Sequence, residues 1–308
     1  MKIAMLGSGG VGGYFGARLA ASGQEVTFIA RGAHLAAMRE NGLKVKSGLG
    51  DVHIQPTDAT NDTAAVGPVD TIIIAVKLWD TEEAGRAALA MIGPGTTVVS
   101  LQNGVECNDI LAPIVGGGRL IGGLAQIAAT VDGPGVISHL GTMGRITIGE
   151  LGGGTSDRVA ALHDACAEAG IETAASDDIE RAIWEKFVFL VGLSGTTALM
   201  RQPVGPIRED ADGRAFLLSV MEETVAVGRA KGIGLDAGFA RERLGFIDGL
   251  PYDMAASMYH DLMRENRLEL DWLSGAVVRF GAGLGVATPV NRAIYAALKP
   301  YAAGGGGA

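Results

Sequence analysis

The sequence is poor in cysteine, in aromatic residues and in long apolar runs. Its two cysteines, Cys107 and Cys166, are too few for a disulfide framework, and neither a C-x-x-C pair nor clustered histidines suggest a metal site. This usage favours a reducing cytoplasm. The apolar stretch 187–200 is shorter than the roughly 18 to 20 residues of a membrane span and is broken by small and polar residues. We therefore expect no metal and no transmembrane segment.

Positive charge is also scarce, because 25 lysines and arginines stand against 34 acidic residues and give a formal net charge of −9. A field of this sign repels nucleic acid and anionic membranes, so we expect neither as a partner. A small anionic ligand would need a local basic pocket. Glycines crowd the chain by residue 7, and no basic segment precedes a continuous apolar one, so we expect no signal peptide.

The sequence pattern along the 308 residues indicates two different types of secondary structure. In the first half, strand-like runs alternate with helical stretches, which predicts a mostly parallel sheet covered by helices. The expected strands are "KIAMLG", "EVTFIA", "DTIIIAV", "TTVVSLQ", "LIGGLAQIAAT" and "RITIGE", and the expected helices lie near 11–22, 33–41, 80–92 and 156–169. The second half shows long helical patterns, clearest at 213–231 and 256–265.

The change from alternating strands and helices to helices alone predicts a domain boundary near Asp177. The expected fold class is α/β, with an α/β domain over 1–177 followed by an all-α domain over 178–308 that binds substrate. The apolar helical half could also support a homodimer. The glycine-rich end, 302–308, has nothing to pack and is expected to be a frayed tail.

A glycine pattern follows the first strand. Gly7, Gly9 and Gly12 have the spacing G-x-G-x-x-G and open a helix, with Gly10 and Val11 between them. In a chain with 48 glycines the spacing is weak by itself, and its position between strand and helix is what makes it indicative. The three glycines permit a tight turn, the approach of a pyrophosphate and close helix packing. We expect a Rossmann dinucleotide-binding domain; the alternative is a glycine-rich turn that binds nothing.

Arg31 ends the second strand, about 20 residues beyond the glycines, where an Asp or Glu would bind the ribose of NAD. A guanidinium there would bind the 2′-phosphate of NADP by paired, charge-assisted hydrogen bonds, and we expect no acidic residue beside it to repel that phosphate. We therefore expect NADP (NADPH) as the cofactor. The alternative is a solvated surface arginine.

Polar residues also follow the third and fourth strands, whose carboxyl ends face the ligand in an open α/β sheet. Lys77 could supply positive charge to an anionic substrate, and Asn103 could position the carboxamide of the cofactor or an oxygen of the substrate. The alternatives are a solvated loop lysine and an ordinary turn residue in an Asn–Gly pair.

Lys186 heads the run "EKFVFLVGLSGTTALM", in which most residues are apolar or small. Burying a lysine is costly unless the ammonium is paired or opens into a cleft. The ammonium could reach the crevice between the domains, opposite the nicotinamide, and deliver a proton as hydride arrives at carbon. The alternative is a side chain that reaches solvent from the start of the helix.

A cationic lysine in a cleft needs a carboxylate, and the segment 257–275 offers candidates. Ser257, Asp261 and Glu265 have the i, i+4, i+8 spacing of one helical face. We expect a helix break at Asn266, so that Glu269 starts the next helix. The alternatives are a solvated helix face for Asp261 and Glu265, a helix cap for Ser257 and a favourable charge in a first turn for Glu269. The spacing does not choose among these readings.

Taken together, these residues resemble the ketopantoate reductase family (2-dehydropantoate 2-reductase). The resemblance runs from residue 1 to about 300. It is carried by "GSGGVGGYFGARLA", "ARG", "VK", "QNG", "GPGVISHLG", "WEKF", "SMYHDL" and "GVATPVNRAIYAALK". The family consists of NADPH-dependent enzymes of pantothenate biosynthesis with a Rossmann domain and a helical carboxyl-terminal domain.

The resemblance implies a role for each matching residue. Lys186 matches the catalytic general acid and Glu269 the acidic residue that cooperates with it. Asn103 and Ser257 match contacts to the substrate or the nicotinamide, Lys77 matches a lysine of the cleft, and Arg31 matches the ligand of the 2′-phosphate.

One departure concerns the substrate. One and two turns after the catalytic lysine, where the family usually has asparagines facing the substrate, this chain has Leu190 and Ser194. Leu268 also replaces a common threonine beside Glu269. A leucine cannot hydrogen-bond a hydroxyl or carboxylate, and such bonds discriminate strongly between substrates.

We expect NADPH-dependent reduction of a small 2-keto acid. Ketopantoate is the substrate that the resemblance implies, and another 2-keto or β-keto acid with a more apolar tail is the alternative. An NADP-binding sensor without catalysis is the alternative of another class.

Overall fold

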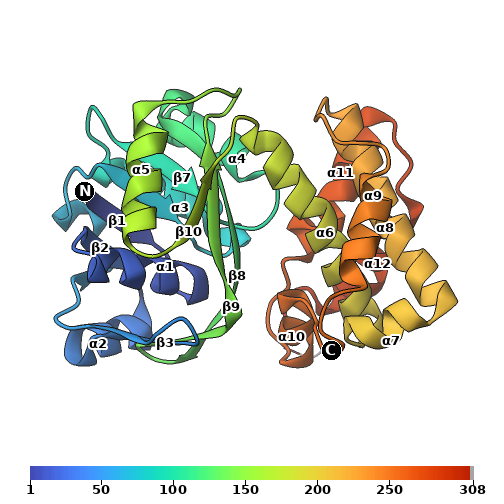
Figure 1. Cartoon of the computed structure of the whole chain (residues 1–308), viewed down its shortest axis with the longest axis horizontal. Helices are drawn as coiled ribbons and strands as arrows, with labels where there is room; N and C mark the ends of the chain where they lie inside the picture. Colours follow the sequence, from blue (N-terminus) through green and yellow to red (C-terminus); the bar gives the residue numbers. More distant parts are fainter. Residues whose placement is uncertain (306–308) are drawn as a thin grey trace. The chain divides into compact units, whose positions relative to one another are not determined.

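The computed structural model describes residues 1–305, and the chain divides into two compact units, Met1–Glu180 and Arg181–Ala308. The expected boundary between residues 177 and 178 lies just before this division. Figure 1 shows the first unit as a sheet flanked by helices and the second as helices alone. The predicted class, an α/β domain followed by an all-α domain, is confirmed.

The first unit is built on a ten-stranded sheet. Its centre is parallel, in the order β7-β6-β1-β2-β5, and a hairpin of β8 and β9 extends it to β3 and β4. The strands are β1 (Lys2–Leu6), β2 (Glu25–Ile29), β3 (Leu43–Ser47), β4 (Val52–Ile54), β5 (Ala59–Thr60), β6 (Thr71–Ile74), β7 (Thr97–Ser100), β8 (Leu120–Gly133), β9 (Val136–Gly149) and β10 (Glu172–Ala175).

Helices cover both faces of the sheet because the central strands are apolar on both sides. Ile3 and Met5 of β1 face a core shared with α1, α2 and α5, whereas Ala4 and Leu6 face a core shared with α3 and α4. The helices are α1 (Gly10–Ala21), α2 (Gly32–Asn41), α3 (Thr81–Ala88), α4 (Cys107–Val115) and α5 (Asp157–Glu168), with short 3₁₀ turns η1 (Thr63–Ala65), η2 (Leu78–Asp80), η3 (Leu89–Met91) and η4 (Gly117–Arg119). The four helices expected in this half are therefore present.

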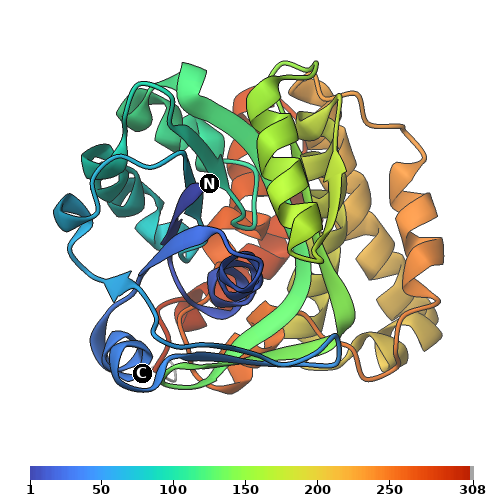
Figure 2. The same cartoon turned by 60° about the vertical axis from the view of Figure 1, so that its left-hand side comes forward.

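The β8–β9 hairpin is much longer than expected. Each strand has 14 residues, whereas the sequence indicated only 120–130 and 145–150. The added part, 131–144, contains glycines and a proline, and the pairing of the two strands has two register shifts, between Ile127 and Ala129 and between Val131 and Gly133. These features hide the alternation of a strand. In Figure 2 this hairpin, in green, curves past the dark-blue helix α1, against which it packs. Strands β3 to β5 and helix α4 were also not expected.

The second unit is a bundle around α8, which contacts α7, α9, α11 and α12. Its helices are α6 (Ile179–Met200), which starts two residues before the division, α7 (Val204–Glu209), α8 (Ala211–Ala230), α9 (Phe239–Ile247), α10 (Ser257–Met263), α11 (Ser274–Leu284) and α12 (Pro289–Leu298), with 3₁₀ turns η5 (Leu270–Trp272) and η6 (Lys299–Tyr301). The expected helices at 213–231 and 256–265 correspond to α8 and α10.

Small residues let α6 and α8 approach closely. A Cβ on Gly192 of α6 would lie 2.5 Å from the Met221 side chain of α8, and a Cβ on Gly228 of α8 would lie 2.8 Å from the Trp184 ring of α6. The two contacts occur in opposite order along the two helices, so the helices run antiparallel. Glycines inside a helix cost stability, and here they are offset by this close packing.

Helix α6 has 22 residues and a hydropathy of 1.2, so it has the length and composition of a membrane span. The apolar stretch in the sequence, 187–200, is shorter than this helix. The helix begins at Ile179, and its first turns contain charged residues that interrupt the apolar pattern. In the protein, 61% of its most apolar window is buried. This burial is typical of the core helix of a globular unit.

The start of α12 is fixed by a buried amide and a carboxylate. Glu223 of α8 accepts hydrogen bonds from the backbone N–H groups of Val290 and Asn291, at 2.7 and 2.9 Å. The Asn291 side chain is fully buried and donates to Glu223 and to the Val220 carbonyl. The "TPVN" part of the segment "GVATPVNRAIYAALK" is therefore explained by packing of the helical bundle.

The expectation of a frayed tail over 302–308 is wrong for residues 302–305. Ala302 accepts a hydrogen bond from the backbone of Leu268 at 2.9 Å, and Gly305 donates one to Glu265 at 2.8 Å. These bonds hold 302–305 against the segment that leads to Glu269. Residues 306–308 lie outside the described part of the chain.

Candidate functional site

The glycine loop joins β1 to α1 with the geometry that its spacing predicted. Gly7 has φ +95°, and a Cβ there would lie 2.7 Å from the backbone nitrogen of Val76. A Cβ on Gly12 would lie 2.0 Å from the Gly7 carbonyl oxygen. Only glycine fits these two positions, one because of its turn conformation and the other because helix and loop touch.

Gly9 and Gly10 differ in their surroundings. A Cβ on Gly9 would meet no protein atom within 4 Å, so the loop is open there, at the residue before α1. A Cβ on Gly10 would lie 2.2 Å from the Ala129 carbonyl oxygen, so this glycine serves the packing of β8 on the loop. Val11 packs partly on the apolar core. The first turn of α1 contains no acidic residue, so the open space at Gly9, directly before the helix, fits a phosphate group.

Arg31 lies just beyond the end of β2, as expected, and precedes α2. Its Nη2 donates a hydrogen bond of 2.6 Å to Oε1 of Glu83, in the first turn of α3. Both side chains are about two-thirds exposed, at 67% and 64%. The position of Arg31 after β2 agrees with the expectation, but the expected absence of an acidic residue beside it is wrong. Glu83 lies 52 residues later in the chain, and only the fold brings it to Arg31.

His34 is a further residue of this region that the sequence did not indicate. Its Nε2 donates to the Ser8 carbonyl at 2.8 Å, a tautomer assigned because Nδ1 accepts from the backbone N–H of Gly135 at 3.0 Å. One ring thereby ties α2 to the glycine loop and to the turn of the β8–β9 hairpin. A lone histidine in a helix carries no sequence signal for such a role.

Lys77 and Asn103 follow β6 and β7, which pair in parallel next to β1. They therefore lie at the same edge of the sheet as the glycine loop and Arg31. Lys77 is exposed, with its ammonium 5.6 Å from the centre of the Trp79 ring, and Asn103 is half-buried. Next to Asn103, the buried amide of Gln102 donates to the Val76 carbonyl at 3.1 Å and to the Thr81 hydroxyl at 2.9 Å. These bonds hold together the segments that follow β6 and β7.

In the second unit, Lys186 lies two turns inside α6 and is half-buried. It is therefore not at the start of the helix, from which a side chain reaches solvent easily. Leu190 and Ser194 follow it at i+4 and i+8 on the same face. Leu190 is half-buried, whereas Ser194 is fully buried, and its hydroxyl has no hydrogen-bond partner within residues 1–305. The expected contact of Ser194 with a substrate stays a prediction.

The acidic candidates separate by burial. Glu269 is only 7% exposed and lies between two buried leucines, just before η5, so it precedes a 3₁₀ turn and not an α-helix. Ser257 is the exposed first residue of α10, and Asp261 is half-buried. Glu265 does not share their helical face, because α10 ends at Met263 and Glu265 has φ +56°.

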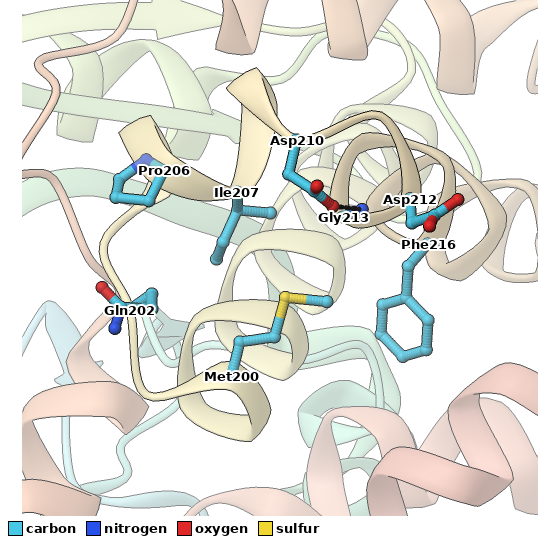
Figure 3. A pocket seen from close by; sticks show the side chains of 8 residues that line it. All are labelled: Met200, Gln202, Pro206, Ile207, Asp210, Asp212, Gly213 and Phe216. Atoms are coloured by element: carbon cyan, nitrogen blue, oxygen red, sulfur yellow. Dashed lines mark hydrogen bonds between the residues drawn. The ribbon is translucent and has the colours of Figure 1, made fainter.

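A separate hollow of about 350 Å³ lies at the opposite end of α6. Figure 3 shows it between Met200, Ile207 and Phe216, with Asp210 bonded to the backbone of Gly213 at the start of α8. Met200 is 14 residues from Lys186, or about 20 Å along the helix. This hollow is therefore distinct from the surroundings of Lys186. Among residues 1–305, no cluster of three or more metal-ligating side chains is present.

Comparison with known proteins identifies both units. The sequence profile described as "Ketopantoate reductase PanE/ApbA" matches residues 3–153, and that described as "Ketopantoate reductase PanE/ApbA C terminal" matches residues 178–302. A curated relative, "Uncharacterized oxidoreductase YkpB" of Bacillus subtilis (strain 168), is 30% identical over 303 residues, which are 98% of this chain and 99% of the relative.

Two solved structures extend the likeness to the fold. The 2-dehydropantoate 2-reductase from Geobacter metallireducens GS-15 has a TM-score of 0.91 and 30% identity, over 97% of this chain and 99% of that one. The D-mandelate dehydrogenase solved with NADH and anilino(oxo)acetate has a TM-score of 0.88 and 25% identity, over 98% of both chains. These matches, together with the glycine loop and the helical second unit, show that the chain is an oxidoreductase that belongs to the ketopantoate reductase family.

Proposed function

We propose that the chain reduces the carbonyl group of a small 2-keto acid with NADPH. The observation that carries the proposal is the open space at Gly9, above the amino end of α1, at the sheet edge that also holds Arg31, Lys77 and Asn103. A helix terminus that is open at Gly9 and has no acidic residue in its first turn favours a pyrophosphate. Membership of the family and the NADH complex of a structural neighbour support a nicotinamide cofactor.

In this proposal, each residue of the sheet edge binds one part of the cofactor. The N–H groups that follow Gly9 bind the pyrophosphate, Arg31 binds the 2′-phosphate, and Asn103 orients the nicotinamide carboxamide and the substrate carbonyl. The bound cofactor supplies the hydride. Lys77 adds positive charge for the carboxylate of a keto acid, which the net charge of −9 would otherwise repel.

Lys186 is the proposed proton donor. Its position two turns inside a largely buried helix restricts the ammonium more than a position at the helix end would. As the substrate carbonyl is reduced, its oxygen gains negative charge, and the ammonium both stabilises that charge and transfers a proton to it. The buried carboxylate of Glu269 holds the positive charge in place. Ser257, exposed at the start of α10, offers a hydroxyl to the substrate.

The substrate tail is the second part of the proposal. Leu190 follows Lys186 on the same face of α6, so an apolar side chain stands where the family usually has an asparagine. This favours a 2-keto acid with a more apolar tail than ketopantoate as a second candidate substrate. The neighbour solved with anilino(oxo)acetate, a ligand with an aromatic group, agrees with that choice.

The test is oxidation of NADPH by the purified protein, followed at the nicotinamide absorbance, with ketopantoate and a panel of 2-keto acids with aliphatic or aromatic tails. Efficient turnover of ketopantoate supports the pantoate-forming reaction. Turnover of apolar-tailed acids alone supports the second candidate. Tight binding of NADPH without oxidation by any of the acids would refute the proposal and favour a cofactor-sensing protein.

A further inference from the structure

The ion pair between Arg31 and Glu83 crosses the carboxyl end of β1. Arg31 follows β2, and Glu83 lies in α3, which follows β6. Strands β2 and β6 pair with β1 on opposite sides. The glycine loop leaves the sheet from β1, between the two partners. A cofactor seated on that loop with its 2′-phosphate at Arg31 would therefore meet this pair.

The pair has the features of a contact that opens readily. One hydrogen bond of 2.6 Å joins it, from Nη2 of Arg31 to Oε1 of Glu83, and both side chains are more than 60% exposed. Exposed ion pairs of this kind contribute little to stability and are screened by salt. Glu83 also lies in the first turn of α3, where the helix dipole favours a carboxylate with or without a partner.

We propose that Glu83 competes with the 2′-phosphate of NADPH for Arg31 and thereby limits the preference of the chain for NADPH over NADH. This inference rests on the proposed function. A phosphate and a carboxylate need the same guanidinium donors, and two anions at one site repel each other. The phosphate carries more charge and more acceptor oxygens, so it can displace the carboxylate, at a cost in affinity. NADH lacks this phosphate and leaves the pair intact.

A positioning role for Glu83 predicts the opposite result. If the carboxylate held the guanidinium in the orientation that the phosphate needs, its removal would weaken binding of NADPH. The direction of the change therefore separates competition from positioning. The exposure of both side chains favours competition, because an exposed surface pair does little to fix an orientation.

The experiment measures the dissociation constants of NADPH and NADH by titration calorimetry, for the wild-type chain and for Glu83→Gln. We expect NADPH to bind about two- to fivefold more tightly to the variant, because exposed ion pairs typically contribute interaction energies of that size. NADH should bind equally to both. The gain should shrink at high salt. Glu82→Gln is the matched control, because Glu82 lies in the same helical turn and pairs with Arg86 at 2.5 Å.

Unchanged or weaker binding of NADPH to Glu83→Gln, or an equal gain in Glu82→Gln, would overturn the competition. Arg31→Ala separates this failure from failure of the proposed function. When Arg31→Ala weakens NADPH relative to NADH but Glu83→Gln has no effect, only the role of Glu83 is wrong. When Arg31→Ala leaves the ratio of the two affinities unchanged, the assignment of the 2′-phosphate to Arg31 is wrong as well. In the double variant, the gain from Glu83→Gln should vanish.

Discussion

A single ammonium group is the proton donor in the proposed reaction. Lys186 lies inside α6, half-buried, with the buried Phe187 and Val188 directly after it. We expect Lys186→Ala to lower kcat by about a hundredfold or more, because general acid catalysis typically contributes that much. The dissociation constant of NADPH should stay within about twofold, because the proposed cofactor contacts are in the other unit. Steady-state kinetics and calorimetry measure the two quantities.

Lys186→Arg tests charge apart from proton transfer. The guanidinium keeps the positive charge but does not release a proton near neutral pH. We therefore expect slow turnover with KM for the keto acid closer to the wild-type value than in Lys186→Ala. Turnover of Lys186→Ala comparable to wild type would remove the lysine from the mechanism.

Individual residues were predictable where local backbone geometry dictates the amino acid. The glycines at 7 and 12 stand where a Cβ would collide with the backbone, so their spacing indicated the loop. His34 and Gln102 were not predictable, because their roles depend on bonds to residues 21 or more positions away, such as Ser8, Val76 and Thr81. The pairing of Glu83 with Arg31 was not predictable either, because the two residues are 52 positions apart in the chain.

At the scale of elements, an ion pair fixes the connection from β9 to α5. Glu150, just after β9, accepts hydrogen bonds from Nε and Nη2 of Arg158, at 2.6 and 2.5 Å, and from the Ser156 hydroxyl. Arg158 also donates to the carbonyl of Gly118, just before β8, and to that of Leu120, the first residue of β8. The Arg158 guanidinium holds the pKa of the Glu150 carboxyl below its usual range, and the Ser156 hydroxyl adds to this effect.

This lowered pKa predicts how acid affects stability. A carboxyl whose pKa is lower in the folded chain stabilises the fold fully above its unfolded pKa of about 4.3, and the contribution is lost as the pH falls through the folded value. We expect Glu150→Gln to lower the free energy of unfolding at pH 7 by about 1 kcal/mol. Below pH 4 the difference should shrink. Urea unfolding at pH 7, 5 and 3.5 measures it, and a difference that is constant with pH would contradict the linkage.

Whole elements were predictable in proportion to how regular their pattern is. The central parallel strands are short, continuous apolar runs, and α8 is a long helix, so both were found. The far part of the β8–β9 hairpin was not, because its glycines and register shifts interrupt the alternation. The end of α10 at Met263 was placed two residues late, and this error moved Glu265 onto a helical face that it does not occupy.

At the scale of the whole molecule, the proposed function links cofactor binding to the stability of the fold. A ligand that binds only the folded chain, at about 100 times its dissociation constant, raises the free energy of unfolding by about 2.7 kcal/mol. The glycine loop offers two neighbouring positions that separate this binding from folding. Gly9 faces open space, whereas Gly10 faces the Ala129 carbonyl.

Gly9→Ala should fold as the wild type does, because its φ of −74° suits alanine and the new methyl group meets no protein atom within 4 Å. The methyl group would instead occupy the space proposed for the pyrophosphate, so the thermal stabilisation by NADPH should be largely lost. Gly10→Ala should lower the melting temperature without ligand, because its Cβ would lie 2.2 Å from the Ala129 oxygen, an overlap that costs about 1–3 kcal/mol to relieve. Thermal unfolding of both variants with and without NADPH measures these effects. Full stabilisation of Gly9→Ala by NADPH would mean that the pyrophosphate does not lie over Gly9, and the proposed cofactor site would then be wrong.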